Sequence, residues 1–520
     1  MKKLLIKDIK LPITSSEDEV LFEARKRVGK INGGVFSVYK KSLDMRKRDN
    51  PMFVYSVLAE LENGKIPKIN GADVYEESSF EVTPRKKKRV CVIGFGPAGM
   101  FASLLLSQYG FSPVVYERGA EVQERTQNVE RFISGGALDT ESNVQFGAGG
   151  AGTFSDGKLY TRINDPACGY VLKMLVKFGA PKSVLTLAKP HIGTDILRDV
   201  VKGISDEVVK NGGDIRYRTR VDSISNKNGG VCVKTSSGDE EIFDAVILAV
   251  GHSARDTYGM LMKNGVILTP KAYSVGVRIE HLQSDINRSL YGELCEKYAD
   301  ILPQGEYALS DRGAGGRGAY TFCMCPGGVV VPSSSDADEI CTNGMSYSSR
   351  SGPYANSAVC VSVLPEDYGN TPTGAIEFQR NIEKTAFGKA GGDYSAPVMT
   401  VGDLLRGKRG SEPAYTPSYM NGKYTLCDLS DIFPSFITET LKEGLLSFDR
   451  KIHGFAKEKT PLTAPETRTS SPVRITRDES MQTPYMTGVY PCGEGAGYAG
   501  GITSAAIDGM RAARAVMENA

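Results

Sequence analysis

Residues 89–119 read RVCVIGFGPAGMFASLLLSQYGFSPVVYERG, an apolar strand, a tight glycine turn, a small-residue helix and a second strand that ends on Glu117. Gly94 allows the turn out of the first strand, and Gly99 lets the helix pack closely against it. Gly96 has no side chain, so a pyrophosphate can approach the backbone. The segment therefore predicts a unit that binds a dinucleotide.

The start of this helix supplies the charge that such a ligand needs. The helix starts at Pro97 and Ala98, and the free N–H groups of its first turn after the proline present about half a positive charge to phosphates. Glu117 lies where a carboxylate can accept hydrogen bonds from ribose hydroxyls, and Arg118 follows it. The alternative is an ordinary strand, turn and helix with incidental glycines.

A second glycine-rich segment argues against that alternative. Residues 487–511 read TGVYPCGEGAGYAGGITSAAIDGMR, which predicts a strand over 488–490, a glycine turn over 493–501 and a helix from about residue 503. A separate nucleotide domain would need a further strand and acid after this helix. We therefore expect the helix to point its N-terminus at the other half of the same ligand. The candidate contacts are Gly493, Glu494, Gly501, Ile502 and Thr503.

Together the two segments resemble the two-motif flavoproteins of the glutathione-reductase-like FAD superfamily. In that superfamily a late strand–acid–helix element holds the ribityl chain and the flavin edge, and the usual acid is Asp, where this chain has Glu494. The resemblance implies FAD as the cofactor. Residues 244–254, DAVILAVGHSA, resemble the superfamily's internal strand motif, which is closed here by Gly251. Residues 213–221 resemble the strand whose end meets adenine, so Val221 is a candidate contact, and residues 222–243 carry the turn signals of a β-meander.

Longer motifs narrow the resemblance to one bacterial family. They are ESNVQFGAGGAGTFSDGKLYTR (141–162), KPHIGTDILR (189–198), KAYSVGVRIEH (271–281), TFCMCPGG (321–328) and APETRTSSPVR (464–474). The chain resembles the family called FAD-dependent proteins or "NAD(FAD)-utilizing dehydrogenases". This implies an α/β fold with a Rossmann-like FAD-binding domain of the glutathione-reductase type. It also implies an inserted α+β cap domain and a small N-terminal α+β domain, and it leaves the substrate open.

Three units are expected along the chain: residues 1–86, a discontinuous FAD-binding domain at 87–264 and 464–520, and an inserted cap at 265–463. For the first unit we expect a ferredoxin-like arrangement in which Ser16 and Glu19 form a capping box. Its predicted elements are strand 4–13, helix 17–28, strand 35–43 and strand 53–61. For the cap we expect antiparallel strands at 273–279, 328–332 and 358–364, then a helical part from about residue 377 to 456.

Charge is uneven along the chain. Residues 1–89 hold 20 Lys and Arg against 13 Asp and Glu, whereas the whole chain has a formal net charge of +2. The simpler interpretation is a solvated accessory domain, followed by a charged linker, PRKKKR, at 84–89. The alternative is a surface that docks nucleic acid, for which binding would depend steeply on salt.

Composition indicates a soluble cytoplasmic protein with no membrane partner. No apolar run approaches the roughly 20 residues that span a bilayer, and the N-terminus lacks the pattern of a signal peptide. The ten cysteines are scattered, which fits a reducing compartment. No histidine or third cysteine follows at ligand spacing, so we expect no metal site.

Residues 147–158, GAGGAGTFSDGK, form a loop that we expect near the pyrophosphate and the isoalloxazine. Successive backbone N–H groups in such a loop can bind an anion, side chains can hydrogen-bond the cofactor, and a lysine can stabilise negative charge near reduced flavin. A purely structural glycine turn is the alternative. The candidate contacts are Gly149, Gly150, Ser155, Asp156 and Lys158.

The sequence identifies no catalytic residue. Cys323 and Cys325 lie two apart on a predicted strand, so they share a face that can meet the flavin, although two packed thiols are the simpler interpretation. His191 lies at the entry to a predicted helix, and His252 follows Gly251, close to the nucleotide by position. Structural roles suit both histidines better than general acid–base roles. Arg278, Arg350 and Arg468 are candidates for bidentate binding of an anionic substrate. The alternative interpretation is that these arginines form ion pairs at the surface.

These observations predict an FAD-dependent oxidoreductase that transfers a hydride or electrons through flavin N5 and acts on a small organic substrate. With one complete dinucleotide fold, NAD(P)H can serve as an electron donor only by a transient visit to the cap side. Two alternatives stay open. One is a flavoprotein that acts on RNA through residues 1–89, and the other is an electron-transfer or redox-sensing flavoprotein. The oligomeric state is not predicted.

Overall fold

The computed structural model describes residues 2–29, 34–47, 49–61, 71–76, 80–161, 163–313 and 315–519. Its centre is a five-stranded parallel sheet in the order β23-β11-β5-β6-β7. Numbered along the chain and read from the β7 edge, this order is 3-2-1-4-5, which is the doubly wound arrangement of nucleotide-binding sheets. The predicted Rossmann-like α/β fold is confirmed. The strands are β5 (Val90–Ile93), β6 (Val114–Tyr116), β7 (Asp214–Arg216), β11 (Ala245–Leu248) and β23 (Val489–Pro491).

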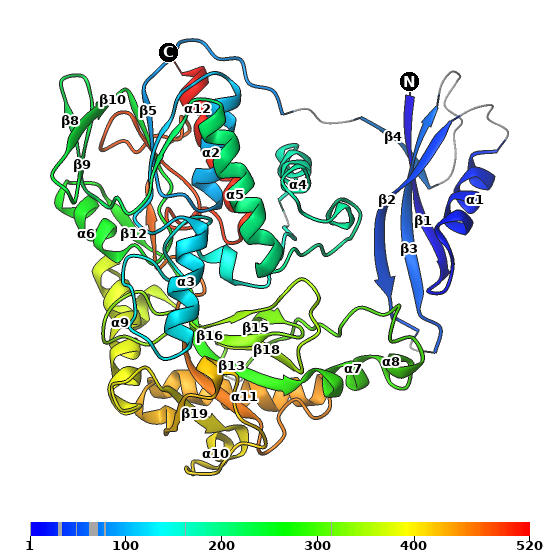
Figure 1. The fold of residues 1–520 in the computed structure, drawn as a ribbon. Helices are drawn as coiled ribbons and strands as arrows, with labels where there is room; N and C mark the ends of the chain where they lie inside the picture. The colour runs from blue at the N-terminus through cyan, green and yellow to red at the C-terminus, as the bar shows by residue number, and fades with distance from the viewer. Residues whose placement is uncertain are drawn as a thin grey trace.

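Two helices from opposite ends of the chain pack side by side on this sheet (Figure 1). They are α2 (Pro97–Gln108) and α12 (Ile502–Glu518), and their contact is backbone to backbone. A Cβ built on Gly509 of α12 would lie 2.0 Å from the carbonyl oxygen of Ala98 in α2. This close approach brings the two helix N-termini to the same end of the sheet. The other helices of this domain are α3 (Val122–Ile133), α4 (Ala167–Lys177), α5 (Thr194–Lys210) and α6 (Arg255–Lys263).

A three-stranded antiparallel meander follows the parallel sheet. It comprises β8 (Val221–Lys227), β9 (Gly230–Thr235) and β10 (Glu240–Phe243). The sequence expectation of one strand over 213–221 was wrong, because β7 ends at Arg216 and Val221 begins β8. The chain turns between them, with Arg218 at a positive φ of 53°.

The cap is a seven-stranded sheet in the order β14-β15-β18-β13-β21-β19-β20, joined by a short β16–β17 hairpin. Its expected helical part is interrupted, because the buried run Ala396–Thr400 pairs with β21 as a strand. A short apolar run suits a strand or a buried helix equally well, and pairing decides between them. The strands are β13 (Tyr273–Leu282), β14 (Ser310–Arg312), β15 (Gly318–Cys325), β16 (Val329–Pro332), β17 (Thr342–Met345), β18 (Tyr354–Val363), β19 (Ala396–Thr400), β20 (Tyr424–Leu426) and β21 (Pro461–Glu466). The helices are α7 (Gln283–Tyr291), α8 (Leu294–Lys297), α9 (Pro372–Lys389), α10 (Val401–Arg406) and α11 (Ser435–Lys451).

One small antiparallel sheet ties the cap to the FAD-binding domain. Strand β12 (Leu268–Pro270) leaves the nucleotide fold and pairs with β22 (Val473–Ile475), where the chain returns. The two crossings between the nucleotide fold and the cap therefore lie next to each other.

The N-terminal unit is a separate lobe at the right of Figure 1. Its elements are β1 (Lys2–Pro12), α1 (Glu17–Val28), β2 (Val35–Asp44), β3 (Met52–Leu61) and β4 (Ala72–Tyr75). The antiparallel order β2-β3-β1-β4 is that of a ferredoxin-like sheet. Ser16 and Glu19 form the predicted capping box. Tyr291 of α7 and Leu302 complete the core of this lobe, so it rests on the cap.

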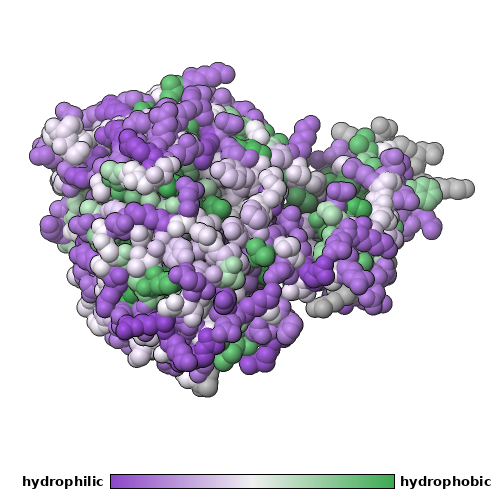
Figure 2. All heavy atoms as spheres, turned by 60° about the horizontal axis from the view of Figure 1, so that its bottom comes forward, coloured by the Kyte–Doolittle hydropathy of each residue, from purple (hydrophilic) through white to green (hydrophobic). Residues whose placement is uncertain are grey.

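Polar side chains cover most of the face shown in Figure 2, on both lobes. None of the helices that the structure describes is long and apolar enough to cross a membrane.

Candidate cofactor site

A cavity of about 380 Å³ opens at the carboxyl ends of the parallel strands, between the sheet and the cap. This is the edge at which doubly wound sheets bind their ligands. Most of the residues predicted from sequence line it. They are Gly94, Gly96, Pro97, Ala98, Glu117, Arg118, Gly150, Ser155, Asp156, Lys158, Val221, Gly251, Glu494, Gly501 and Ile502.

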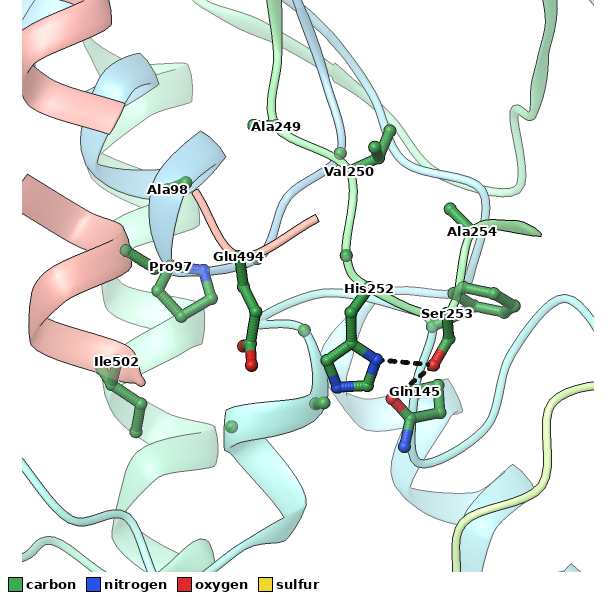
Figure 3. Close-up of a pocket in the computed structure, with 18 of the residues that line it drawn as sticks. Pro97, Ala98, Gln145, Ala249, Val250, His252, Ser253, Ala254, Glu494 and Ile502 are labelled. Carbon is green, nitrogen blue, oxygen red and sulfur yellow. Dashed lines mark hydrogen bonds between the residues drawn. The ribbon is translucent and has the colours of Figure 1, made fainter. Parts of the chain in front are cut away.

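Two helix N-termini face this cavity. Gly96 caps α2 and Gly501 caps α12, and neither provides a side chain to accept a hydrogen bond from the first turn. The first N–H groups of a helix have no partner within the helix, and together with the helix dipole they attract anions. In Figure 3, Pro97 and Ile502 mark the two helix starts on one side of the cavity. The arrangement fits a ligand that carries phosphates at one helix start and an electron-rich ring at the other.

The glycines show that the cavity is shaped for a ligand. Gly96 has φ −77°, which any residue can adopt, and a Cβ built on it would lie 3.6 Å from the Cα of Gly150, an ordinary contact. Gly251 has no neighbouring atom within 4 Å of such a Cβ. Neither glycine is required by the protein's own packing, yet both line the cavity. The open space above their backbone fits the close approach of a dinucleotide.

Glu117 is buried, with 4% of its surface exposed. Its Oε2 accepts from the Phe95 N–H (2.7 Å), and its Oε1 accepts from the N–H groups of Gly119 (2.9 Å) and Gly147 (3.0 Å). A carboxylate offers about four acceptor positions, so one is left for a ribose hydroxyl. Glu117 therefore also fixes the glycine turn and the loop after Gly147, a role that the sequence did not reveal.

Four of the predicted cofactor residues do not line the cavity, and three of these are packing glycines. A Cβ would lie 1.9 Å from the Gly94 oxygen at Gly99, 2.1 Å from Thr153 Oγ1 at Gly149, and 2.8 Å from the Ala98 Cβ at Gly493. The fourth, Thr503, donates its hydroxyl to the carbonyl oxygen of Leu159 (2.8 Å). These residues shape the walls behind the cavity surface.

Two of the three arginines proposed for an anionic substrate, Arg278 and Arg350, lie outside the cavity lining, and each is paired with a carboxylate. Arg278 is fully buried, and its Nε and Nη2 donate to Glu466 at 2.8 Å each. Arg350 donates from Nε to Oδ1 of Asp156 (3.0 Å). Asp156 also pairs with Lys158 (Nζ–Oδ2 3.0 Å), so the predicted loop is held by its own ion pairs. Neither guanidinium is free to bind a substrate.

Glu494 and His252 point toward the same open space (Figure 3). Burial raises the pKa of Glu494 to about 7, although the positive charge of Lys271 opposes this. Burial, together with the charges of Arg468 and Arg255, lowers the pKa of His252 to about 3. At neutral pH His252 is therefore an uncharged imidazole.

A chain of polar side chains orients this imidazole. The Ser253 hydroxyl donates to Gln145 Oε1 (3.0 Å), and the Gln145 amide donates to Ser333. His252 Nδ1 lies 3.0 Å from Ser253 Oγ, and with the serine proton given to Gln145, Nδ1–H is the donor there. The Nε2 lone pair is then free toward the cavity. Gln145 lies in a motif quoted from the sequence, but only the fold brings it to His252.

A buried ion-pair cluster joins the cavity wall to the cap. Arg255 of α6 donates to Glu339 (2.9 Å) and, with both Nη atoms, to Glu383 of α9 (2.8 Å each). Arg468, which lines the cavity, donates to the same Glu383 (3.0 and 2.7 Å). The two guanidinium groups hold the pKa of Glu383 far below its usual value although burial opposes this. Among the described residues, no group of three His, Cys, Asp or Glu side chains is placed to hold a metal ion.

Comparison with known proteins identifies the family. A protein of Clostridium beijerinckii (strain ATCC 51743 / NCIMB 8052), described as uncharacterized, is 44% identical over 492 residues, which are 92% of each chain. The chain belongs to the family of this clostridial protein. Residues 272–469 match the family model described as "FAD-dependent protein, C-terminal domain-like", and residues 140–262 match "Flavin containing amine oxidoreductase". Both family models describe flavin proteins, and the chain is an FAD-dependent oxidoreductase.

Solved structures give only distant similarities. Glycine oxidase from Geobacillus kaustophilus is 9% identical with a TM-score of 0.36, over 83% of this chain and 94% of that one. CtdE in complex with FAD is 10% identical with a TM-score of 0.32, over 82% of each chain. Scores this low support no functional argument.

Proposed function

We propose that this protein is a dehydrogenase or reductase of a small organic molecule, and that it belongs to the two-motif, glutathione-reductase-like FAD superfamily. The observation that carries the proposal is the convergence of two glycine-capped helix starts, Gly96 and Gly501, on one cavity whose far wall comes from the cap. When bound, FAD supplies two-electron chemistry, and the protein's part is to hold, orient and screen the reactants.

The wall residues divide this work. The first turns of α2 and α12 offer N–H groups to phosphates and to the flavin edge, Glu117 retains one acceptor position for a ribose hydroxyl, and Glu494 faces the middle of the cavity. The His252 Nε2 accepts a hydrogen bond from a donor in the cavity without adding charge. A neutral imidazole is a weak base at its lowered pKa, so His252 positions a group and does not take up a proton.

The cap wall indicates the chemistry of the substrate. It contributes Phe322, Cys323 and Asn343 to the lining. Each arginine that lines the cavity already has an acid partner: Arg118 pairs with Glu141, Arg220 with Asp222, and Arg468 with Glu383. Paired guanidinium groups attract a further anion weakly, so we propose a substrate that is uncharged or zwitterionic.

Anaerobic reduction tests this function. The purified protein is titrated with NADH and with NADPH while the flavin absorbance is followed, then reoxidised with candidate acceptors. We expect one nicotinamide to bleach the flavin within the time of a turnover. The Gly96→Val variant, in which a side chain fills the nucleotide wall, is the matched control and should show no bleaching. A fully loaded protein that neither nicotinamide nor any small organic donor reduces would contradict the proposal and favour a protein redox partner.

A further inference from the structure

Cys323 differs from the other cysteines in its position, because it lines the cofactor cavity. Cys325, two residues later on β15, is fully buried behind it. The pair therefore places one cysteine at the cavity wall and a second, fully buried, two residues further along the same strand.

The backbone at this pair is distorted. Phe322 pairs with Ala358 of β18 and Cys325 pairs with Asn356, so Cys323 and Met324 oppose a single residue in a β-bulge. Cys323 itself has a positive φ of 45°. A left-handed conformation is strained for a residue other than glycine, and such strain is concentrated at functional sites. The bulge interrupts the regular alternation of the strand at the point where it meets the cavity.

Two cations hold this bulge in place. Arg278, at the centre of the cap sheet, donates from Nη1 to the carbonyl oxygen of Cys323 (2.8 Å). Its Nε and Nη2 donate to the carboxylate of Glu466. Lys158 donates to the carbonyl oxygen of Met324. The arginine that sequence reasoning assigned to a substrate is thus a positioning residue for the thiol pair.

The same groups make the two sulfurs unequal. The Cys325 thiol donates to the carbonyl oxygen of Cys323 at 3.3 Å. Hydrogen bonding between the two thiol groups, with the charges of Arg278 and Lys158, holds the pKa of Cys323 well below its usual value although burial opposes it. The hydrogen bond and burial hold the pKa of Cys325 well above it. A half-buried thiolate at a cavity wall next to a fully buried thiol is an arrangement from which a disulfide forms and is reduced.

We propose that Cys323 and Cys325 form a redox-active dithiol that exchanges two electrons with the bound flavin. In the forward direction the Cys323 thiolate and the Cys325 thiol would form a bond between their sulfur atoms, and the two electrons released, with the single proton of Cys325, would pass to oxidised FAD. In the reverse direction the disulfide would take up two electrons and one proton from the reduced cofactor, which restores the thiolate and the thiol. A disulfide that spans one intervening residue closes a small, strained ring, and strain makes such a bond easier to reduce. The inference rests on the proposed redox function, and it adds a second electron store beside the cofactor.

Electron counting on the intact holoprotein tests the dithiol. The protein is oxidised, freed of oxidant and titrated anaerobically with dithionite, and FAD is quantified separately after heat release. We expect uptake of about four electrons per FAD, since the flavin and the disulfide are each two-electron couples. The variants Cys323→Ser and Cys325→Ser should take up about two. Cys341→Ser, which removes a cysteine from the same tryptic peptide (residues 318–350), should still take up about four.

A thiol count gives a readout that does not depend on the flavin. The oxidised, denatured protein should show two fewer reactive thiols than its ten cysteines, and the peptide 318–350 should be lighter by two hydrogens. Ten free thiols and two electrons per FAD in a fully loaded protein would overturn the dithiol and leave two packed thiols. A protein without FAD would contradict the proposed function itself, and the separate FAD assay tells these results apart.

Discussion

Gly96 and Gly99 lie three residues apart and are glycine for different reasons. A Cβ built on Gly96 would lie no closer than 3.6 Å to a protein atom outside its chain neighbours, whereas one on Gly99 would lie 1.9 Å from the Gly94 oxygen. We predict that Gly96→Val keeps the melting temperature of the apoprotein but lowers FAD content more than tenfold, because only the ligand needs that space. Gly99→Ala should instead lower the melting temperature and the soluble yield. Thermal melts and heat-released FAD measure both, and normal FAD content in Gly96→Val would contradict the placement of the pyrophosphate.

Glu494 should make stability depend on pH. Its folded pKa of about 7 lies above the unfolded value near 4.3, so the folded protein takes up a proton between these values. The contribution of Glu494 to the free energy of unfolding is full below about pH 4.3 and is lost as pH rises through 7. We predict that the wild-type and Glu494→Gln apoproteins melt together at pH 4, and that the wild type melts roughly 2 °C below the variant at pH 8. Equal melting temperatures at both pH values would show that Glu494 titrates normally.

The limit of sequence reasoning is visible in individual residues. Local patterns predicted the Ser16–Glu19 capping box and most of the cavity glycines, because each is decided within a few residues. Contacts between distant segments were not predictable. The sequence around Arg278 did not indicate that its guanidinium pairs with Glu466. The sequence around His252 did not indicate that Gln145 helps to orient its ring through Ser253. Both contacts depend on which strands and loops become neighbours, and sequence alone does not show this.

At the scale of elements, Glu383 is the residue that holds α9 of the cap to α6 of the nucleotide fold. It accepts from Arg255 and Arg468, and all three side chains are at most 4% exposed. Glu383→Gln leaves two buried guanidinium groups with one weaker partner. We predict a loss of about 3–5 kcal/mol in the free energy of unfolding, measured by chemical denaturation.

The surface pair Arg288–Glu296, at about 70% exposure, is the control for this prediction. Glu296→Gln should cost at most about 1 kcal/mol, because solvent screens an exposed ion pair. Equal losses for the two variants would show that the buried cluster does not hold the domains together.

At the scale of the whole molecule, the alternative hypothesis is that the basic N-terminal lobe binds RNA. Several of its cations already have acidic partners, such as Lys7 with Asp73 and Arg46 with Asp44. We therefore predict no mobility shift of bulk tRNA at low or at moderate salt, with a known tRNA-binding protein as the positive control. A shift that weakens steeply with salt would restore the RNA-binding hypothesis.

The whole account depends on α2 and α12 sharing one cofactor, and the most direct test is the amount of FAD that the protein carries. Purified protein is heated, and the flavin in the supernatant is identified and quantified against the protein. The account predicts about one FAD per chain, with reconstitution of any apoprotein by added FAD. A colourless protein that releases no FAD and takes none up would contradict it.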